Sequence, residues 1–340
     1  MPVKRNIIPV FIPHLGCPHD CVFCNQRKIS GQTKPATPES VSGEIRSGLL
    51  KAPNGDTQVA FYGGSFTAIP AAEQEALLGA ALPFLHSGAI SSLRVSTRPD
   101  AIDGGVIERL RRCGVKTVEL GVQSMDETVL KMSNRGHTAE DAEKAAKMLK
   151  AAGFELILQM MTGLPGDTLE KSLYTACSLA ALAPDGVRIY PTVIIKDTRL
   201  FEMAKSGEYC EHTVDEAVSW CAEILEVFKR ENIPVIRLGL NPTDDLSAGE
   251  AVGGAYHPAL GELVYAEMCF NAEKKLIGDD ARDAAYVEFE VPRGRMSQAV
   301  GQHGKNRRRL HEQYNIKQVK FVESPASDGE IKLINIAKNG

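Results

Sequence analysis

Between residues 6 and 238 the chain alternates short apolar, β-rich runs with amphipathic stretches. The predicted strands are residues 6–13, 58–62, 92–97, 117–120, 154–159 and 186–190. In one intervening stretch, residues 138–152, alanines and a leucine recur at helical spacing. Thr138 and Asp141 form a helix start there, and Gly153 forms a stop. Apolar strands separated by helices predict a parallel sheet with the helices outside it.

Unusual residues follow each predicted strand. These segments are residues 16–25, 63–66, 97–100, 121–124, 163–167 and 190–193. Functional residues at the carboxyl ends of successive strands are typical of a β/α barrel. Six strand–helix pairs instead of eight leave such a barrel open on one side, which suits a large substrate. The predicted fold class is therefore α/β, an open (β/α)6 partial TIM barrel.

The first of these segments carries three cysteines, Cys17, Cys21 and Cys24, in a C-x3-C-x2-C pattern. Three thiolates are one fewer than the four that fill a closed zinc or iron–sulfur site. A [4Fe–4S] cluster held by this loop keeps one iron without a protein ligand. The alternatives are a structural zinc loop completed by His14 or His19, and three unrelated core cysteines.

This spacing, with the aromatic Phe23 between the last two cysteines, resembles the cluster loop of radical S-adenosylmethionine (SAM) enzymes. In that superfamily the open iron chelates the amino and carboxyl groups of SAM. An electron from the cluster then cleaves SAM to a 5′-deoxyadenosyl radical. The resemblance implies an enzyme with two cofactors, a [4Fe–4S] cluster and SAM, served by an electron donor such as flavodoxin or ferredoxin.

The later strand-end segments fit such a cofactor site. Gly63 and Gly64 let the backbone approach the charged methionine end of SAM. Arg98 and Gln123 suit a carboxylate and a ribose or amino group, and Gly163 begins a Gly-Leu-Pro-Gly segment that can pass along an adenine ring. A tight turn, an ion pair or an ordinary loop explains each segment taken alone. Their order behind the cysteine loop favours the cofactor site.

Six segments together resemble the radical-SAM half of the Elongator catalytic subunit. They are residues 61–67, 97–100, 118–124, 134–138, 163–166 and 188–193, and Asn-Arg-Gly-His-Thr at 134–138 is the most specific. The resemblance covers roughly residues 5–270. It implies an open barrel, one cluster bound by Cys17, Cys21 and Cys24, SAM, and action on the wobble uridine of tRNA. The candidate cofactor-binding residues are Gly63, Gly64, Ser96, Arg98, Gln123, Gly163 and Arg188.

The chain departs from that family in three places. The family has a longer gap between its first two cysteines, and Ser96 stands where it has Glu in Glu-Thr-Arg-Pro-Asp. About 60 residues follow residue 280, too few for the family's acetyltransferase domain. The Elongator reaction therefore does not transfer directly, and the catalytic residues for the substrate step stay unassigned.

The C-terminal residues predict a different module. Strands are expected over 286–292, 317–323 and 330–337, and helices over 293–300 and 305–314, with Gly301-Gln-His-Gly304 between the helices. This order resembles a KH RNA-binding module, whose GxxG loop clamps a single-stranded backbone. Residues 293–320 carry eight Lys or Arg against one acid, Glu312. The candidate RNA-binding residues are Gly301, Gln302, His303, Gly304, Lys305, Arg307, Arg308 and Arg309.

That module has a plainer alternative. Arg307 stands at a helix position that is usually apolar in KH modules. A small α+β cap with a solvated basic face would show the same run of arginines. The predicted domains are a radical-SAM barrel over 1–240, a helical connector over 241–280 and a KH-like module over 281–340.

The 340 residues fit about two domains, and the apolar run ending at Pro13 is too short for a membrane span. A dense cluster of thiols in a chain of this length predicts a cytoplasmic, reducing location, and five further cysteines without ligand spacing argue against a second cluster. The main hypothesis is a radical-SAM enzyme that modifies a base of RNA, most simply tRNA, with no DNA partner. The alternatives are a small-molecule enzyme related to oxygen-independent coproporphyrinogen oxidases, and an RNA-binding iron–sulfur redox sensor.

Overall fold

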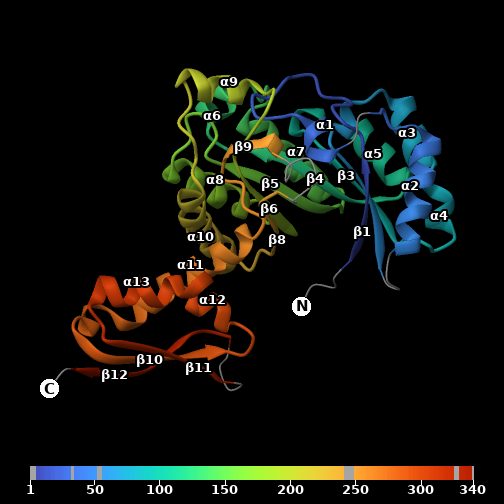
Figure 1. The fold of residues 1–340 in the computed structure, drawn as a ribbon. Helices are drawn as coiled ribbons and strands as arrows, with labels where there is room; N and C mark the ends of the chain where they lie inside the picture. Colours follow the sequence, from blue (N-terminus) through green and yellow to red (C-terminus); the bar gives the residue numbers. More distant parts are fainter. Residues whose placement is uncertain (1–4, 32–33, 52–55, 241–248, 325–328, 339–340) are drawn as a thin grey trace. The chain divides into compact units, whose positions relative to one another are not determined.

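The computed structural model describes residues 5–31, 34–51, 56–240, 249–324 and 329–338 (Figure 1). It divides into two compact units. The first comprises residues 1–213 and 224–256, and the second comprises residues 214–223 and 257–340. Each unit has its own sheet and its own core.

The first unit is built on a seven-stranded sheet in which every adjacent pair is parallel. In spatial order its strands are β1 (Asn6–Phe11), β2 (Thr57–Tyr62), β3 (Ser92–Thr97), β4 (Val115–Gln123), β5 (Glu155–Thr162), β6 (Gly186–Pro191) and β8 (Val235–Leu238). Spatial order follows chain order throughout, as in a β/α barrel opened along one side. The six predicted strands are confirmed, and β8 is a seventh that the sequence did not predict.

Helices alternate with these strands along the chain, and several of them pack against the sheet (Figure 1). They are α1 (Gln26–Ser30), α2 (Pro38–Lys51), α3 (Ala71–Gly79), α4 (Leu82–His86), α5 (Gly104–Arg112), α6 (Glu127–Met132), α7 (Ala139–Ala151), α8 (Leu169–Ala181), α9 (Arg199–Ser206) and α10 (Val214–Arg230), with short 3-10 turns at η1 (Phe66–Ala68) and η2 (Pro99–Ala101). Helix α7 starts as predicted. Thr138 and Asp141 form its capping box, and Gly153 follows its end at φ +81°.

A two-stranded antiparallel ribbon stands apart from the main sheet. Its strands are β7 (Val193–Ile195) and β9 (Ala251–Gly254), which pair at Val193–Gly254 and Ile195–Ala251. The ribbon packs with Ile29 of α1 and with Tyr256 in a small apolar cluster. The Nζ of Lys28 also lies 2.6 Å from the Asp197 carboxylate and 2.5 Å from that of Glu250. These contacts connect the end of the cysteine loop to the ribbon.

The second unit packs α11 (Leu260–Ile277), α12 (Met296–Val300) and α13 (Lys305–Tyr314) on one face of a three-stranded sheet (Figure 1). The central strand, β10 (Ala284–Pro292), pairs in parallel with β11 (Gln318–Ser324) and antiparallel with β12 (Lys332–Lys338). Turns η4 (Asp279–Ala281) and η5 (Gln302–Gly304) complete the unit. The predicted order of strands and helices is therefore present, although α12 starts three residues later than expected, because Gly294 makes a turn at φ +80°.

Helix α11 belongs to the core of the second unit, since Phe270 and Ile277 pack with Val287 and Phe289 of the sheet. The connector expected over residues 241–280 thus contains a core helix, and its first eight residues lie outside the described part of the chain. Among the helices that the structure describes, none combines the length and the apolar surface needed to cross a membrane.

Candidate functional site

A cavity of about 540 Å³ opens on the inner face of the first unit's sheet. Its walls combine the cysteine loop with residues from β1 to β6 and β8. This volume lies within the range of small-molecule sites. Of the predicted cluster and cofactor residues, the cavity is lined by Cys17, Cys21, Cys24, Gly63, Gly64, Ser96, Arg98, Gln123 and Arg188, but not by Gly163.

The Asn-Arg-Gly-His-Thr motif holds the cysteine loop in place. The Asn134 Nδ2 donates to the Asp20 carbonyl at 2.9 Å, and the Val22 amide donates to the Ser133 carbonyl at 3.1 Å. A Cβ at Gly136 would overlap the ring of His19, so only glycine fits there, at φ +78°. On its other side the loop accepts a hydrogen bond from the Leu200 amide at the Val22 carbonyl, at 2.7 Å.

Two of the three sulfurs receive side-chain N–H donors. Arg135 Nη1 lies 3.4 Å from Cys21 Sγ, and Gln26 Nε2 lies 3.4 Å from Cys24 Sγ. Burial, followed by the neighbouring Cys21, raises the pKa of Cys24 to about 12, and burial raises the pKa of Cys17. These thiols therefore hold their protons until a metal displaces them, after which the N–H donors stabilise the sulfur charge.

The donor set fits an iron–sulfur cluster. In the described part of the chain, no three His, Cys, Asp or Glu side chains converge on one metal-ion position. A [4Fe–4S] cluster gives each thiolate its own iron, so it does not require the convergence that a zinc ion does. The alternative of a structural zinc loop required His14 or His19 as its fourth ligand. His14 Nε2 already accepts the Gln26 amide at 3.0 Å, and His19 packs against Gly136.

The two glycines after β2 are required by packing as well as by any ligand. Gly63 adopts φ +89°, which disfavours other residues. A Cβ at Gly64 would overlap the carbonyl oxygens of Ile12 and Leu15, which lead into the cysteine loop. The alternative of a tight turn is therefore present, and this turn brings the cysteine loop against the sheet; the close approach to SAM stays a prediction.

The other candidate cofactor residues differ in their burial, their backbone conformation and the hydrogen bonds that they already make. Arg98 is 2% exposed and donates two bonds to Asp100, at 2.9 and 3.0 Å. Gln123 adopts φ +71° beside a register shift in β4, and its Oε1 accepts a bond from Gln159 at 3.3 Å. Gly163 packs against His212, and its carbonyl accepts a bond from Tyr209 at 2.6 Å.

Deeper in the cavity, charged side chains gather around one carboxylate oxygen. Glu119 Oε1 lies 2.5 Å from Arg94 Nη1, 2.9 Å from Arg188 Nη2 and 3.1 Å from the Tyr62 hydroxyl. Arg188 also donates to the hydroxyls of Tyr62 and Tyr190, at 2.8 and 3.1 Å. Sequence reasoning found only Arg188 here. Charged residues inside an apolar strand were the available signal for Arg94 and Glu119.

Sequence reasoning also missed Arg135. It is 8% exposed, contacts Cys21 and donates to the Gly121 carbonyl at 2.5 Å, and its Nε has no hydrogen-bond partner among the described residues. The motif that contains it was recognised as a whole, but the spacing gave no reason to place its arginine at the cysteine loop.

In the second unit the GxxG loop projects two exposed side chains, Gln302 and His303, ahead of α13. Gly301, at φ +75°, is fixed by close packing against Asn306. The Asn306 amide is buried and donates to the carbonyls of Ala266, Gln298 and Ala299, at 2.8, 3.3 and 3.1 Å. The loop is therefore anchored from below while its two central side chains face solvent.

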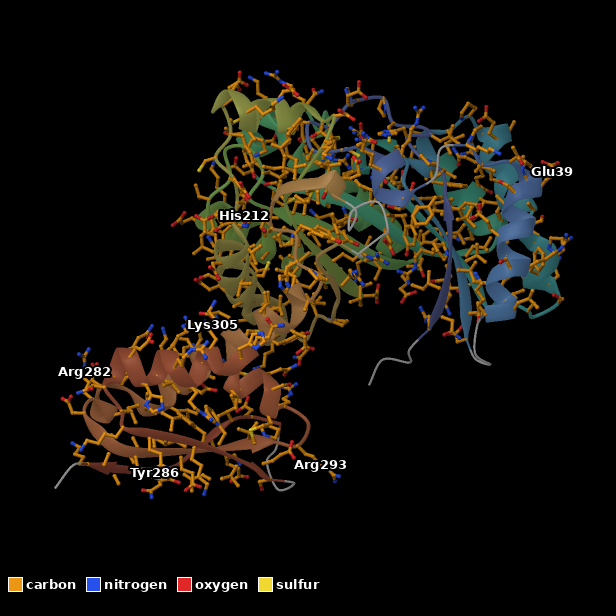
Figure 2. All side chains as sticks on the ribbon, viewed as in Figure 1. Glu39, His212, Arg282, Tyr286, Arg293 and Lys305 are labelled. Atoms are coloured by element: carbon orange, nitrogen blue, oxygen red, sulfur yellow. The ribbon has the colours of Figure 1, made fainter. Side chains whose placement is uncertain are left out.

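The basic residues of α13 differ in their exposure to solvent and in the contacts that hold their side chains. Lys305, labelled in Figure 2, is exposed and lies 3.1 Å from Asp215. Arg309 donates two bonds to Glu267 and stacks on Phe270, 3.6 Å from the ring centroid. Arg307 lies over Phe321 at 5.7 Å, and Arg308 donates to the His303 carbonyl. Arg309 is thus half-buried and fixed, whereas Lys305, Arg307 and Arg308 are exposed.

Comparison with known proteins agrees with this geometry. The Radical SAM superfamily domain matches residues 11–175, and a Radical_SAM C-terminal domain matches residues 184–269. The chain belongs to the radical SAM superfamily. Enzymes of this superfamily use a [4Fe–4S] cluster and SAM, so the chain is a radical SAM enzyme with these cofactors.

The chain is similar to the radical-SAM region of Elp3-type proteins. A tRNA uridine(34) acetyltransferase of Methanocaldococcus infernus is 34% identical over 186 residues, which are 52% of this chain and 33% of the relative. An uncharacterised protein of Methanocaldococcus jannaschii is 30% identical over 236 residues, 64% of this chain and 70% of the relative. This chain therefore spans about a third of the acetyltransferase and most of the uncharacterised relative.

Solved structures show the same fold. The archaeal Methanocaldococcus infernus Elp3 with an N-terminal deletion superposes with a TM-score of 0.63 at 25% identity, covering 80% of this chain and 63% of that one. Coproporphyrinogen III oxidase HemN from Escherichia coli gives 0.50 at 18% identity, covering 67% and 53%. The second likeness shows the fold alone, so the small-molecule alternative receives no support beyond the barrel.

Proposed function

We propose that this radical SAM enzyme modifies a base of RNA, with tRNA as the leading substrate class. The observation that carries the proposal is the similarity of its barrel to a tRNA uridine(34) acetyltransferase, joined to a C-terminal unit with an exposed GxxG loop. The reaction of that relative is not carried over, because the similarity covers a third of its length. The group installed is thus a separate question.

Cys17, Cys21 and Cys24 would hold the cluster, and Gly63, Gly64 and Gln123 would bind SAM. When bound, the cluster supplies the electron that cleaves SAM to methionine and a 5′-deoxyadenosyl radical. The chain's own residues hold the cysteine loop, line a cavity that shields the reaction from solvent, and orient SAM. Arg135 supports a SAM carboxylate site, because its buried guanidinium keeps an unpartnered Nε beside the loop.

The second unit would bind the RNA backbone as a KH-like module. Its strands and helices occur in the β-α-GxxG-α-β-β order, and its loop presents the exposed Gln302 and His303 ahead of a basic helix. A phosphate is attracted to such a loop because glycine permits close approach and the helix N-terminus favours an anion. Lys305, Arg307 and Arg308 are exposed and near enough in sequence to serve the same strand of RNA.

Two measurements test the proposal. Anaerobically purified protein reduced with dithionite should convert SAM to methionine and 5′-deoxyadenosine, and the Cys17→Ala, Cys21→Ala, Cys24→Ala triple variant should not. Nucleoside mass spectrometry of total tRNA from cells with and without the gene should reveal one missing modification. SAM cleavage with unchanged tRNA would leave the enzyme assignment standing and remove the tRNA substrate. An iron–sulfur protein that binds RNA but never cleaves SAM would be the redox sensor instead.

A further inference from the structure

The deep part of the cavity carries an excess of positive charge. Glu119 is the only carboxylate within salt-bridge distance of Arg94 or Arg188 among the described residues, and both guanidinium groups meet at its Oε1. Arg94 and Glu119 are almost fully buried, and the Arg188 side chain is 14% exposed. Two guanidinium groups balanced by one carboxylate leave one net positive charge. A buried charge without a counter-ion is costly, which favours an anionic ligand.

A third arginine adds to this excess. Arg237 on β8 is the register partner of Arg188 on β6, and both line the cavity. A β-bulge between the Val187 and Arg188 pairs brings Arg237 into that register, a common way to aim a side chain into a site. The Arg237 Nε donates to the Gly239 carbonyl at 3.0 Å. No ion pair is formed by Arg237 with any residue that the structure describes.

We propose that Arg188 and Arg237 form a subsite for an oxyanion, a carboxylate or phosphate, carried by the molecule that the SAM-derived radical attacks. This inference rests on the proposed function and specifies the chemistry of its acceptor. It assigns Arg188, one of the candidate cofactor residues, to the acceptor instead of SAM. The subsite lies at the level of Ser96, the register partner of Glu119, and deeper in the sheet than Gln123. Glu119 comes four residues before Gln123 on β4, or roughly 13 Å at about 3.3 Å per residue.

The walls around the subsite fit the body of such an acceptor. Phe11, Met161 and Ile236 line the same cavity and offer apolar surface, while Gln159 and Tyr190 offer polar groups. Arginine forms paired hydrogen bonds to a carboxylate or a phosphate. This pairing is favoured when neighbouring side chains hold the guanidinium plane in one orientation. Arg188 has them, since Tyr62, Tyr190 and Glu119 hold it on three sides.

The test measures binding of defined acids to the cluster-loaded, full-length protein under anaerobic conditions by isothermal titration calorimetry. One arm compares uridine 5′-monophosphate with uridine, and the other compares malonate with malonamide. We expect one acid to bind at least about tenfold more tightly than its neutral partner, as loss of a charge-assisted bond predicts. The arm that responds identifies phosphate or carboxylate as the anion.

The variants locate the site. Arg237→Gln should weaken binding of the responding acid by roughly tenfold, and Arg237→Lys should restore part of it, because the charge returns without the paired geometry. Arg46→Gln, an exposed arginine on α2, is the matched control and should bind like wild type. The subsite is overturned if neither acid binds saturably to the wild-type protein. It is also overturned if Arg237→Gln binds the responding acid as tightly as the wild type does. Wild-type SAM cleavage is measured separately, so loss of the subsite remains distinct from failure of the proposed function.

Discussion

The two units use arginine in opposite ways. In the barrel, Arg94 is buried and Arg188 is half-buried, and each is oriented by neighbours such as Glu119 and Tyr62. On α13, Arg307 and Arg308 are exposed, and their contacts are an aromatic face and a backbone carbonyl. Fixed arginines recognise one shape and charge, whereas exposed arginines follow a flexible polyanion. Under the proposed function, the barrel arginines would select the reacting group and the arginines of α13 would hold the long substrate.

The strongest test of that separation removes the cluster. Changing Cys17, Cys21 and Cys24 together to Ala should abolish bound iron and visible iron–sulfur absorbance, because no thiolate remains to hold the cluster. RNA affinity, measured by filter binding, should stay at the wild-type value if the second unit carries it. Changing the exposed Cys177 and Cys210 to Ala is the control and should leave iron content unchanged. Iron retained by the triple variant would contradict the ligand assignment.

A second test compares the arginines themselves. Arg94→Leu should lower the free energy of unfolding by about 2 kcal/mol, because it removes one of the two ion pairs of the buried Glu119 and leaves the Gln58 amide oxygen without this donor. Arg308→Ala should change it by less than about 0.5 kcal/mol, as exposed substitutions do. Urea unfolding of both variants measures the contrast. Equal losses of unfolding free energy in the two variants would show that burial does not distinguish the barrel arginines from those on α13.

In the described part of the second unit, Glu273 of α11 is a buried ionisable group without a hydrogen-bond partner. Neither of its carboxyl oxygens has a hydrogen-bond partner among the described residues, and burial raises the pKa of Glu273 to about 9, with Arg309 opposing the shift. A raised pKa means that the folded state keeps a proton that the unfolded state releases above its usual value of 4.5. Stability should therefore fall as pH rises between these two values.

By about pH 7 the loss should approach about 3 kcal/mol, at about 1.4 kcal/mol for each pH unit. Glu273→Gln should remove this decline, and Glu262→Gln, an exposed change on the same helix, should keep it. Thermal unfolding across the pH range gives the comparison. A Glu273→Gln protein with the wild-type pH profile would show that this carboxyl is ionised in the folded state.

The smallest expected effect concerns the GxxG loop. Replacing the exposed Gln302 and His303 by Asp puts two anions where phosphates would lie, so tRNA affinity should fall by about tenfold with a flatter salt dependence. Ser47→Asp with Leu50→Asp adds the same charge to exposed positions of α2 and should bind tRNA normally. Unchanged affinity in the loop variant at every salt concentration would remove the KH-like interpretation.

Sequence patterns predicted most of the fold because they describe buried strands well. β1 to β6 are apolar runs followed by special turns, and each was found. β8 was missed because Val235–Leu238 is short and carries Arg237 toward the cavity. β7 and β9 were missed because their pairing joins residues about 60 apart, which local periodicity does not report.

The candidate site was predicted where residue type alone decides the chemistry. Three cysteines at fixed spacing and glycines after a strand needed no knowledge of contacts. The Glu119 cluster could not be predicted, because its members come from β2, β3, β4 and β6 and meet only in the folded sheet. Gly64→Val would not test SAM binding alone, because the new side chain would also displace the carbonyls of Ile12 and Leu15.

The anchoring of the cysteine loop has a consequence for how the enzyme survives oxygen. Asn134 and Leu200 hold the loop through backbone carbonyls, so much of its shape does not depend on iron. A protein whose cluster has been destroyed by oxidation should then keep a loop ready to be refilled. Damage would be repaired by cluster delivery, with no need to refold the chain or synthesise a new one.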